Sequence, residues 1–243
     1  MGKKIKVQRR GRGGSTFRAK SMGKIAPARY HPRLDAETVP GVVASLLHEP
    51  GRGSPLAYIK LDQENGYYVA APEGVYIDQE ISIGSEAAVK VGNVLPLGSI
   101  PESTMICNLE LRPGDGGKIA KSSGSFATVV AHLGDKTIVK LPSKRNVQLS
   151  NNCRATIGIV AGGGRTEKPF LKAGERFYLK RAKGQVYPIA HGVKMTAASH
   201  PHGGGRHRRP GKSTTVSRHA PPGKKVGLIA ARNSGKKKRE RGS

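Results

Sequence analysis

Positive charge is concentrated at the two ends of this 243-residue chain. Residues 1–36 carry 11 basic and 1 acidic side chains, and residues 166–243 carry 20 and 3. The middle is different, because residues 37–92 have a net charge of −5 and residues 93–165 a net charge of +5. Like charges at high density repel one another and oppose the formation of a compact core. The sequence therefore predicts a basic N-terminal extension, two folded segments and a basic C-terminal extension, with these boundaries.

The formal net charge of +27 indicates the kind of partner. A chain this basic is expected to bind a polyanion, either a nucleic acid or an anionic surface. A solvated tail is the alternative interpretation of a single run such as Lys236–Arg239. No apolar run approaches the roughly 18 residues of a membrane span, and the N-terminus lacks the apolar stretch of a signal peptide. Cys107 and Cys153 have no Cys-x-x-Cys partner, which is typical of reduced thiols, so we expect a cytoplasmic protein without a membrane partner.

The two folded segments consist of short apolar or alternating runs separated by turn signals, which is the pattern of small β-barrels. In residues 37–92 we expect strands at Val42–Leu47, Leu56–Leu61, Tyr67–Ala71, Val75–Ile77 and Ala87–Val91. In residues 93–165 we expect strands at Met105–Leu111, Phe126–Ala131, Thr137–Leu141, Val147–Leu149 and Ala155–Val160. Asn65-Gly66 is a hairpin signal, since both residues tolerate the positive φ of a type I′ turn. One helix is predicted, at Leu171–Lys183. Each segment is near the lower size limit of a self-sufficient core, so contact between them or a bound partner should help both.

The segment Ser199–Arg209 combines two histidines, three successive glycines and a cluster of arginines. It is too poor in apolar residues to pack a core of its own, so we expect it to take its shape on a partner. The glycines at 203–205 allow close approach to that partner. Phosphate contact or base stacking is the expected role of His200 and His202, and idle exposed imidazoles are the alternative.

Two glycine-rich stretches of the second segment invite a phosphate-binding interpretation. Arg112–Gly124 contains glycines, hydroxyls and two lysines, and these could offer backbone amides and cations to phosphates. An ordinary long hairpin loop is the alternative. Gly162–Arg165 allows the same two interpretations.

Signatures of enzymes and metal sites are incomplete. Gly211-Lys212-Ser213 ends like a P-loop, but that motif needs a glycine where Arg206 stands. The N-terminal glycines fail the dinucleotide pattern, since Thr16 occupies its last required position. The later histidines lack the recognisable pairs of a zinc site; they are His191, His200, His202, His207 and His219. A general base at His200 is chemically conceivable, but no nucleophile or substrate pocket is predicted near it. We therefore predict no catalytic residue, metal site, cofactor or small-molecule substrate, apart from Mg²⁺ ions that could accompany RNA.

Four motifs resemble one known family when they are taken in order and spacing. They are Gly92–Gly98 (Gly-Asn-Val-Leu-Pro-Leu-Gly), Leu111–Lys121 (Leu-Arg-Pro-Gly-Asp-Gly-Gly-Lys-Ile-Ala-Lys), Cys153–Gly158 (Cys-Arg-Ala-Thr-Ile-Gly) and His200–Gly205 (His-Pro-His-Gly-Gly-Gly). Together they resemble the universal large-subunit ribosomal protein L-two family, uL-two, over nearly the whole chain. The stretches Gln8–Arg18, Val160–Arg165 and Ala220–Arg232 resemble its archaeal and eukaryotic branch, and the compact length favours an archaeon.

The resemblance implies an OB-fold at 37–92, an SH3-like barrel at 93–165, and basic extensions threaded into large-subunit rRNA. It implies a structural, non-enzymatic role near the peptidyl-transferase centre, with support for subunit association and tRNA positioning. Other large-subunit proteins, the small subunit and tRNA would lie nearby. The residues predicted to contact RNA are Arg9, Arg10, Arg12, Arg18, Lys118, Lys121, Arg154, Arg165, His200, His202, Gly203, Gly204, Gly205, Arg206, Arg208, Arg209, Lys212, Arg218, Lys224, Lys225 and Arg232.

The chain departs from the family pattern next to the histidine once proposed as catalytic in the family, which His200 matches. An acidic residue commonly precedes His-Pro, and here it is Ser199. The preceding segment usually reads Arg-Gly-Val-Ala-Met-Asn-Pro, and here His191–Ala197 reads His-Gly-Val-Lys-Met-Thr-Ala. Without a carboxylate to orient the imidazole, we carry His200 over as an RNA-positioning residue only. Two alternatives stay open: a free-standing RNA-binding module or RNA chaperone, and an RNA-dependent enzyme that uses His200.

Overall fold

A computed structural model describes residues 4–31, 38–61 and 66–231. The chain forms two compact units. We call residues 21–171 the β unit, and residues 1–20 with 172–243 the terminal unit. The predicted division into four segments remains a prediction. Three predictions lie partly or wholly outside the described residues: Asn65 of the hairpin signal, the RNA contact of Arg232, and the run Lys236–Arg239.

The β unit contains one ten-stranded sheet, in the order β3-β2-β1-β4-β5-β10-β6-β7-β8-β9. Neighbouring strands pair antiparallel, except that β4 and β5 pair in parallel. The strands are β1 Val39–Leu47, β2 Leu56–Leu61, β3 Gly66–Ala70, β4 Glu80–Ile83, β5 Val94–Pro96, β6 Met105–Cys107, β7 Ala127–Leu133, β8 Lys136–Lys140, β9 Asn146–Ser150 and β10 Arg154–Ile157. The predicted mainly β class is thereby confirmed.

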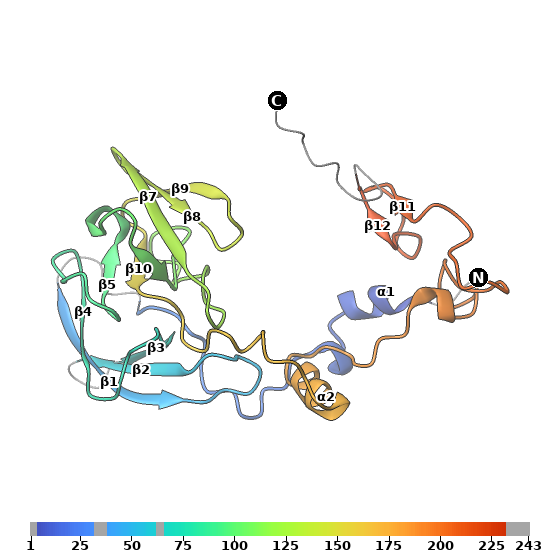
Figure 1. The fold of residues 1–243 in the computed structure, drawn as a ribbon, viewed down its shortest axis with the longest axis horizontal. Coiled ribbons are helices and arrows are strands. Elements are labelled where there is room, and N and C mark those ends of the chain that lie inside the picture. Colours follow the sequence, from blue (N-terminus) through green and yellow to red (C-terminus); the bar gives the residue numbers. More distant parts are fainter. Residues whose placement is uncertain (1–3, 32–37, 62–65, 232–243) are drawn as a thin grey trace. The chain divides into compact units, whose positions relative to one another are not determined.

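The strands of the sheet enclose two large hydrophobic cores, and a third, smaller cluster consists of Ala70, Cys107, Ala120 and Val160. Strands β1 to β4 cover the first core, with Val43, Ile59 and Ile81 almost fully buried. Strands β5 to β10 cover the second, around Ile106 and Val129. Figure 1 shows β1 and β2 side by side and β7, β8 and β9 as a separate group of strands. Two cores in one sheet are what two small consecutive barrels require.

Strand β5 joins the two cores. Successive side chains of a strand point to opposite faces of its sheet. Val94 accordingly packs in the first core, and its neighbour Leu95 packs in the second. Register shifts at Val43/Ser45 in β1 and at Val129/Ala131 in β7 interrupt the two longest strands. Such bulges bend a strand and increase its twist, which helps a small sheet to curl around its core.

Two predicted strands are wrong. Val75–Ile77 and Ala87–Val91 form turns and irregular chain, and β4 and β5 lie nearby instead. The backbone N–H of Asp78, which has a φ of 65°, donates to the Val43 carbonyl, so a tight turn replaces the first of these strands. In the second, Val89 and Val91 are 45% and 44% exposed, and they add nothing to either core. The apolar character of these valines favours a strand in the sequence pattern, but a strand also needs the burial that stabilises it.

The terminal unit has little regular structure. Its elements are helix α1 Lys6–Gly11, helix α2 Ala173–Ala182, the two-residue parallel strands β11 Thr215–Val216 and β12 Leu228–Ile229, and 3-10 helices at Ser15–Phe17 and Gly192–Lys194. The predicted helix is confirmed as α2, which begins two residues later because Lys172 is extended and supplies no side-chain cap. Helix α1 was not predicted. No helix of the described ranges is long and apolar enough to cross a membrane.

Candidate nucleic-acid interface

The two ends of the chain meet within the terminal unit. Helix α1 starts at the buried Ile5, whose N–H donates to the Gln8 side chain at 2.9 Å. A Cβ added at Gly223 would lie 3.4 Å from that same Gln8 amide. Gly184 packs with no space for a side chain against the backbone of Phe17, Arg18 and Ala19. The predicted N-terminal and C-terminal cations therefore lie in one compact unit, a proximity that the sequence did not indicate.

The predicted cations of this unit are mostly exposed. Arg9 and Arg10 lie in the last turn of α1. Those that are exposed include Arg9, Arg10, Arg12, Arg18, Arg206, Arg208, Arg209, Lys212, Arg218 and Lys224, whereas Lys225 is half-buried. Exposed guanidinium and ammonium groups on irregular backbone are free to follow the path of a phosphate chain. Their RNA contacts remain predictions.

The His200–Gly205 segment is held by the chain itself. Gly203 N–H donates to the His200 carbonyl at 2.9 Å, and Gly204 N–H donates to the Met195 carbonyl at 3.0 Å. A side chain at Gly203 would collide with the backbone of Met195 and Thr196. Gly204 and Gly205 both have a φ of 83°, which a residue with a side chain rarely adopts. The glycines thus close a tight loop on the Met195–Thr196 backbone, and Gly205 is the least crowded of them, with the His207 carbonyl oxygen 3.9 Å from an added Cβ.

His200 is fixed in orientation by its surroundings. Its Nδ1 accepts a hydrogen bond of 3.0 Å from the His202 N–H. Nε2 is the remaining polar atom of the ring. Gly192 packs directly on the imidazole, and the His202 ring lies 5.2 Å away in a T-shaped arrangement. Partial burial and the nearby His202 lower the pKa of His200. A neutral, oriented ring is suited to a hydrogen bond or a stacking contact with a base.

The four predicted RNA contacts of the β unit differ in how they are placed. Lys118 is 59% exposed on its side chain and lies 3.3 Å from Asp115. Arg165 is exposed, and its Nε donates to Ser123 Oγ at 3.1 Å. Lys121 is half-buried and donates to the Gly117 and Ala28 carbonyls. Burial, and after it the charges of Arg52 and Arg29, lower the pKa of Lys121. Lys118 and Arg165 face solvent, whereas Lys121 ties the chain to itself.

Arg154 lies in a buried ion pair. Its Nη2 is 2.9 Å from Glu110 Oε1, its Nε donates to Oε2 at 3.3 Å, and its Nη1 donates to the His31 carbonyl at 3.1 Å. The Tyr30 ring lies 5.4 Å from the guanidinium carbon. Arg154 is 5% exposed and Glu110 is fully buried. In this structure Arg154 joins the chain around Tyr30 and His31 to the second core, and its predicted RNA contact is untested.

The Arg112–Gly124 loop uses its amides internally. Asp115 accepts from the N–H groups of Leu111, Arg112 and Gly117. Glu110 accepts from the N–H groups of Gly114 and Gly116, at 3.3 and 2.9 Å. Burial opposes ionisation of Asp115, but these hydrogen bonds outweigh it and lower its pKa. The hypothesis that the loop offers its amides to phosphates does not fit the N–H groups of Arg112, Gly114, Gly116 and Gly117, because two carboxylates of the chain already accept from them.

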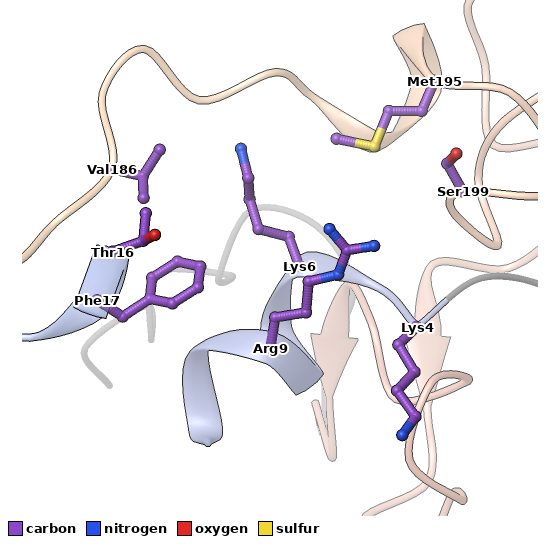
Figure 2. Close-up of a pocket in the computed structure, with 8 residues that line it drawn as sticks. All are labelled: Lys4, Lys6, Arg9, Thr16, Phe17, Val186, Met195 and Ser199. Carbon is purple, nitrogen blue, oxygen red and sulfur yellow. The ribbon is translucent and has the colours of Figure 1, made fainter. Parts of the chain in front are cut away.

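The sequence analysis missed the groups that organise both units. Glu110 follows an apolar run, and its sequence context predicts an exposed residue at a strand end. Its partner, Arg154, lies 44 positions away, so the local sequence does not indicate the ion pair. Phe17, Lys4 and Lys6 line a hollow of about 370 Å³ in the terminal unit, together with Arg9, Thr16, Val186, Met195 and Ser199. Figure 2 shows Lys6 and Arg9 on α1, with Phe17 and Val186 to one side and Met195 to the other. The sequence signal that could have indicated this hollow is the single aromatic residue, Phe17, among the basic residues near the N-terminus. Among the described residues, no three His, Cys, Asp or Glu side chains gather to hold a metal ion.

Comparison with known proteins identifies the family. Residues 90–224 match the model of the C-terminal domain of ribosomal proteins L2. The chain is 55% identical over 239 residues to the large ribosomal subunit protein uL2 of Korarchaeum cryptofilum, covering 98% of both chains. It is 51% identical to that of Hyperthermus butylicus and 48% identical to that of Methanothermobacter thermautotrophicus, covering 98% of this chain and all of each relative. With full-length identity of this order and a matching family model, the chain belongs to the uL2 family of large-ribosomal-subunit proteins, in its archaeal form.

Proposed function

We propose that this chain is a structural constituent of the large ribosomal subunit, and that its terminal unit binds the rRNA. One observation supports this placement of the RNA contacts more than any other. The terminal unit carries 27 basic and 2 acidic residues, a net charge of +25, whereas the β unit carries 16 and 14. Cations threaded between RNA helices reduce the phosphate repulsion that opposes compact rRNA.

The family supports the location of this role in the cytoplasmic ribosome. Contacts near the peptidyl-transferase centre, support of subunit association and placement of tRNA are parts of the same proposal. The β unit holds the two arms, and other large-subunit proteins are its neighbours. Mg²⁺ ions would be bound by rRNA phosphates, and no membrane or small-molecule substrate takes part.

Salt dependence of rRNA binding tests the proposal. Each phosphate contact contributes about −0.7 to −0.9 to the slope of log affinity against log salt. The triple variant Arg206→Gln, Arg208→Gln, Arg209→Gln should reduce the size of that slope by about 2 to 3. Three exposed lysines of the β unit provide the matched control: Lys136→Gln, Lys140→Gln and Lys144→Gln. Equal loss in both triple variants would mean that overall charge, rather than the terminal unit, determines binding.

Two other functions make different predictions. A free-standing RNA chaperone would leave ribosomal subunits in a high-salt wash, whereas a ribosomal constituent should co-sediment with them. An enzyme that uses His200 would lose peptide-bond formation in His200→Ala subunits that assemble normally. We expect such subunits to keep that activity, since His200 Nδ1 already accepts a hydrogen bond from the His202 N–H.

A further inference from the structure

Two hollows of the terminal unit share Phe17 and Val186. The first, of about 370 Å³, is the one drawn in Figure 2. The second, of about 540 Å³, is lined by Arg10, Phe17, Arg176, Lys180, Gly184, Gln185, Val186, Tyr187, Ile189 and His191. Both fall within the roughly 300–1,000 Å³ typical of ligand pockets. Phe17 and Val186 therefore stand where two ligand-sized spaces adjoin.

The lining combines an apolar surface with a cationic rim. Phe17, Val186 and Met195 supply aromatic, aliphatic and thioether surface to the first hollow, and Lys4, Lys6 and Arg9 supply charge. In the second, Arg10, Arg176 and Lys180 supply the charge. Neither lining contains a carboxylate. An apolar ligand would not need these cations, and a lone phosphate would not need the ring.

The backbone of Phe17 is held by contacts within the terminal unit. Its N–H donates to the Gly14 carbonyl at 2.9 Å within a 3-10 turn. Gly184 packs on the backbone of Phe17 and Arg18 so closely that a Cβ at position 184 would collide with it. Beside it, the Arg176 guanidinium lies 5.2 Å from the Tyr187 ring, and Lys180 Nζ donates to Gln185 Oε1 at 2.8 Å. Phe17 is half-buried and its backbone is anchored, which reduces the freedom that the residue loses when a planar group stacks on its ring.

A planar apolar group joined to a phosphate is a nucleotide. Proteins that recognise unpaired RNA stack extruded bases on aromatic side chains and hold the adjoining phosphates with lysine and arginine. We propose that the space at Phe17 receives the base of one unstacked rRNA nucleotide, with Lys6, Arg9 and Arg10 on its phosphates. This inference rests on the proposed function, and it assigns the N-terminal arm a reading of local RNA shape in addition to charge neutralisation.

Chemical probing of rRNA in subunits reconstituted with the full chain tests this inference. The variant Phe17→Leu keeps apolar bulk and all charge but removes the ring. We expect one base that the wild-type chain protects to regain the reactivity of protein-free rRNA, and Phe17→Trp to restore its protection. Affinity for the rRNA should fall about 10-fold or more in Phe17→Leu, the loss of one stacked base. Phe177→Leu is the matched control, because Phe177 is 40% exposed in the same unit but lines neither hollow.

Each outcome separates this inference from the proposed function. If Phe17→Leu leaves the protection of the rRNA base unchanged and rRNA binding stays salt-sensitive, the proposed base contact at Phe17 is wrong. The proposed function is then unaffected. Equal loss in Phe177→Leu overturns the base contact as well, since the fold of the unit would then be responsible. The chain has no tryptophan, so Phe17→Trp also gives a single tryptophan, whose fluorescence can be excited selectively over that of the seven tyrosines. We expect an unstructured oligoribonucleotide to quench it, and an abasic oligonucleotide to leave it bright. Quenching by adenosine monophosphate at equal concentration would instead assign the space to a free nucleotide.

Discussion

The two units of this chain differ in what specifies their structure. The β unit is nearly neutral, with 16 basic and 14 acidic residues, and it buries two large hydrophobic cores and a smaller third cluster. The terminal unit has a net charge of +25, and Ile5 and Val226 are its buried hydrophobic residues within the described ranges. Burial of apolar surface can stabilise the first unit in water, whereas the second carries uncompensated repulsion. The contrast indicates a self-sufficient scaffold and an arm that depends on its polyanion.

Deletion of the C-terminal part of the terminal unit should have the largest effect. It should abolish assembly into the subunit and leave the fold of the β unit unchanged. Deletion of residues 199–243 removes 13 basic side chains and no part of either hydrophobic core. We expect the thermal transition of the β unit to be preserved, as followed by circular dichroism, and stable incorporation into large subunits to be lost. Normal polysomes carrying the truncated chain would contradict the proposed division of labour.

The buried ion pair is the most sensitive point of the β unit. Glu110→Ala removes the carboxylate of the buried ion pair with Arg154, and breaking such a pair costs about 3–5 kcal/mol. Urea unfolding should show this loss, whereas Glu73→Ala, at an exposed position, should stay within about 0.5 kcal/mol of the wild type. The double variant Glu110→Leu, Arg154→Met should recover only part of the stability, because the Gly114, Gly116 and Arg154 N–H groups still lose the carboxylate that accepts from them. A loss below about 1 kcal/mol in Glu110→Ala would mean that the pair is not the connection inferred here.

Matched truncations compare the two units directly. Ile106→Ala in β6 opens a cavity at a position with no exposure, and it should cost about 2–5 kcal/mol. Ile229→Ala removes the same atoms from a residue that is 49% exposed in β12, and it should change stability by about 0.5 kcal/mol or less. Equal costs in urea unfolding would show that the terminal unit has a core of its own, against the comparison above.

Alkaline pH should weaken the β unit slightly. Burial raises the pKa of the Cys107 thiol to about 12 and that of Cys153 to about 11, whereas unfolded thiols ionise near 8.5. The folded state thus favours the neutral thiols. Their stabilisation is complete below about pH 8.5 and is lost as the pH rises towards the folded values. Between pH 8 and 9.5 each thiol should lose about 1 kcal/mol, and Cys107→Ala should show a correspondingly shallower decline. Parallel pH profiles for the two proteins would contradict this linkage.

The strands that could be predicted are those whose apolar pattern coincides with burial. Leu56–Leu61 was predicted with the observed bounds of β2, and Phe126–Ala131 overlaps β7. The short β4 and β5 were missed, because four and three residues give too little periodicity to distinguish a strand from a turn. Their partners, β1 and β10, lie far away in the sequence and supply the pairing that makes them strands.

The candidate interface could be predicted as chemistry but not as geometry. Composition indicated which residue types are suited to contact RNA, and the family motifs indicated where such contacts are expected; the contacts themselves remain predictions. The sequence could not distinguish the exposed Arg206 from the buried Arg154, since both lie in glycine-containing motifs. The carboxylate that binds Arg154 lies 44 residues away. Nor could the sequence show that Gly203 packs on the chain's own Thr196 backbone.

The sequence by itself determined the charge segregation, the mainly β class, the family and the anionic nature of the partner. These properties depend on composition and local pattern, which are present in any conformation of the chain. The tertiary structure alone decided that β5 serves two cores, that Arg154 is buried on Glu110, and that both basic ends meet around Phe17. Each of these depends on contacts between residues far apart in the chain, and such contacts exist only after folding has paid their loop-closure entropy.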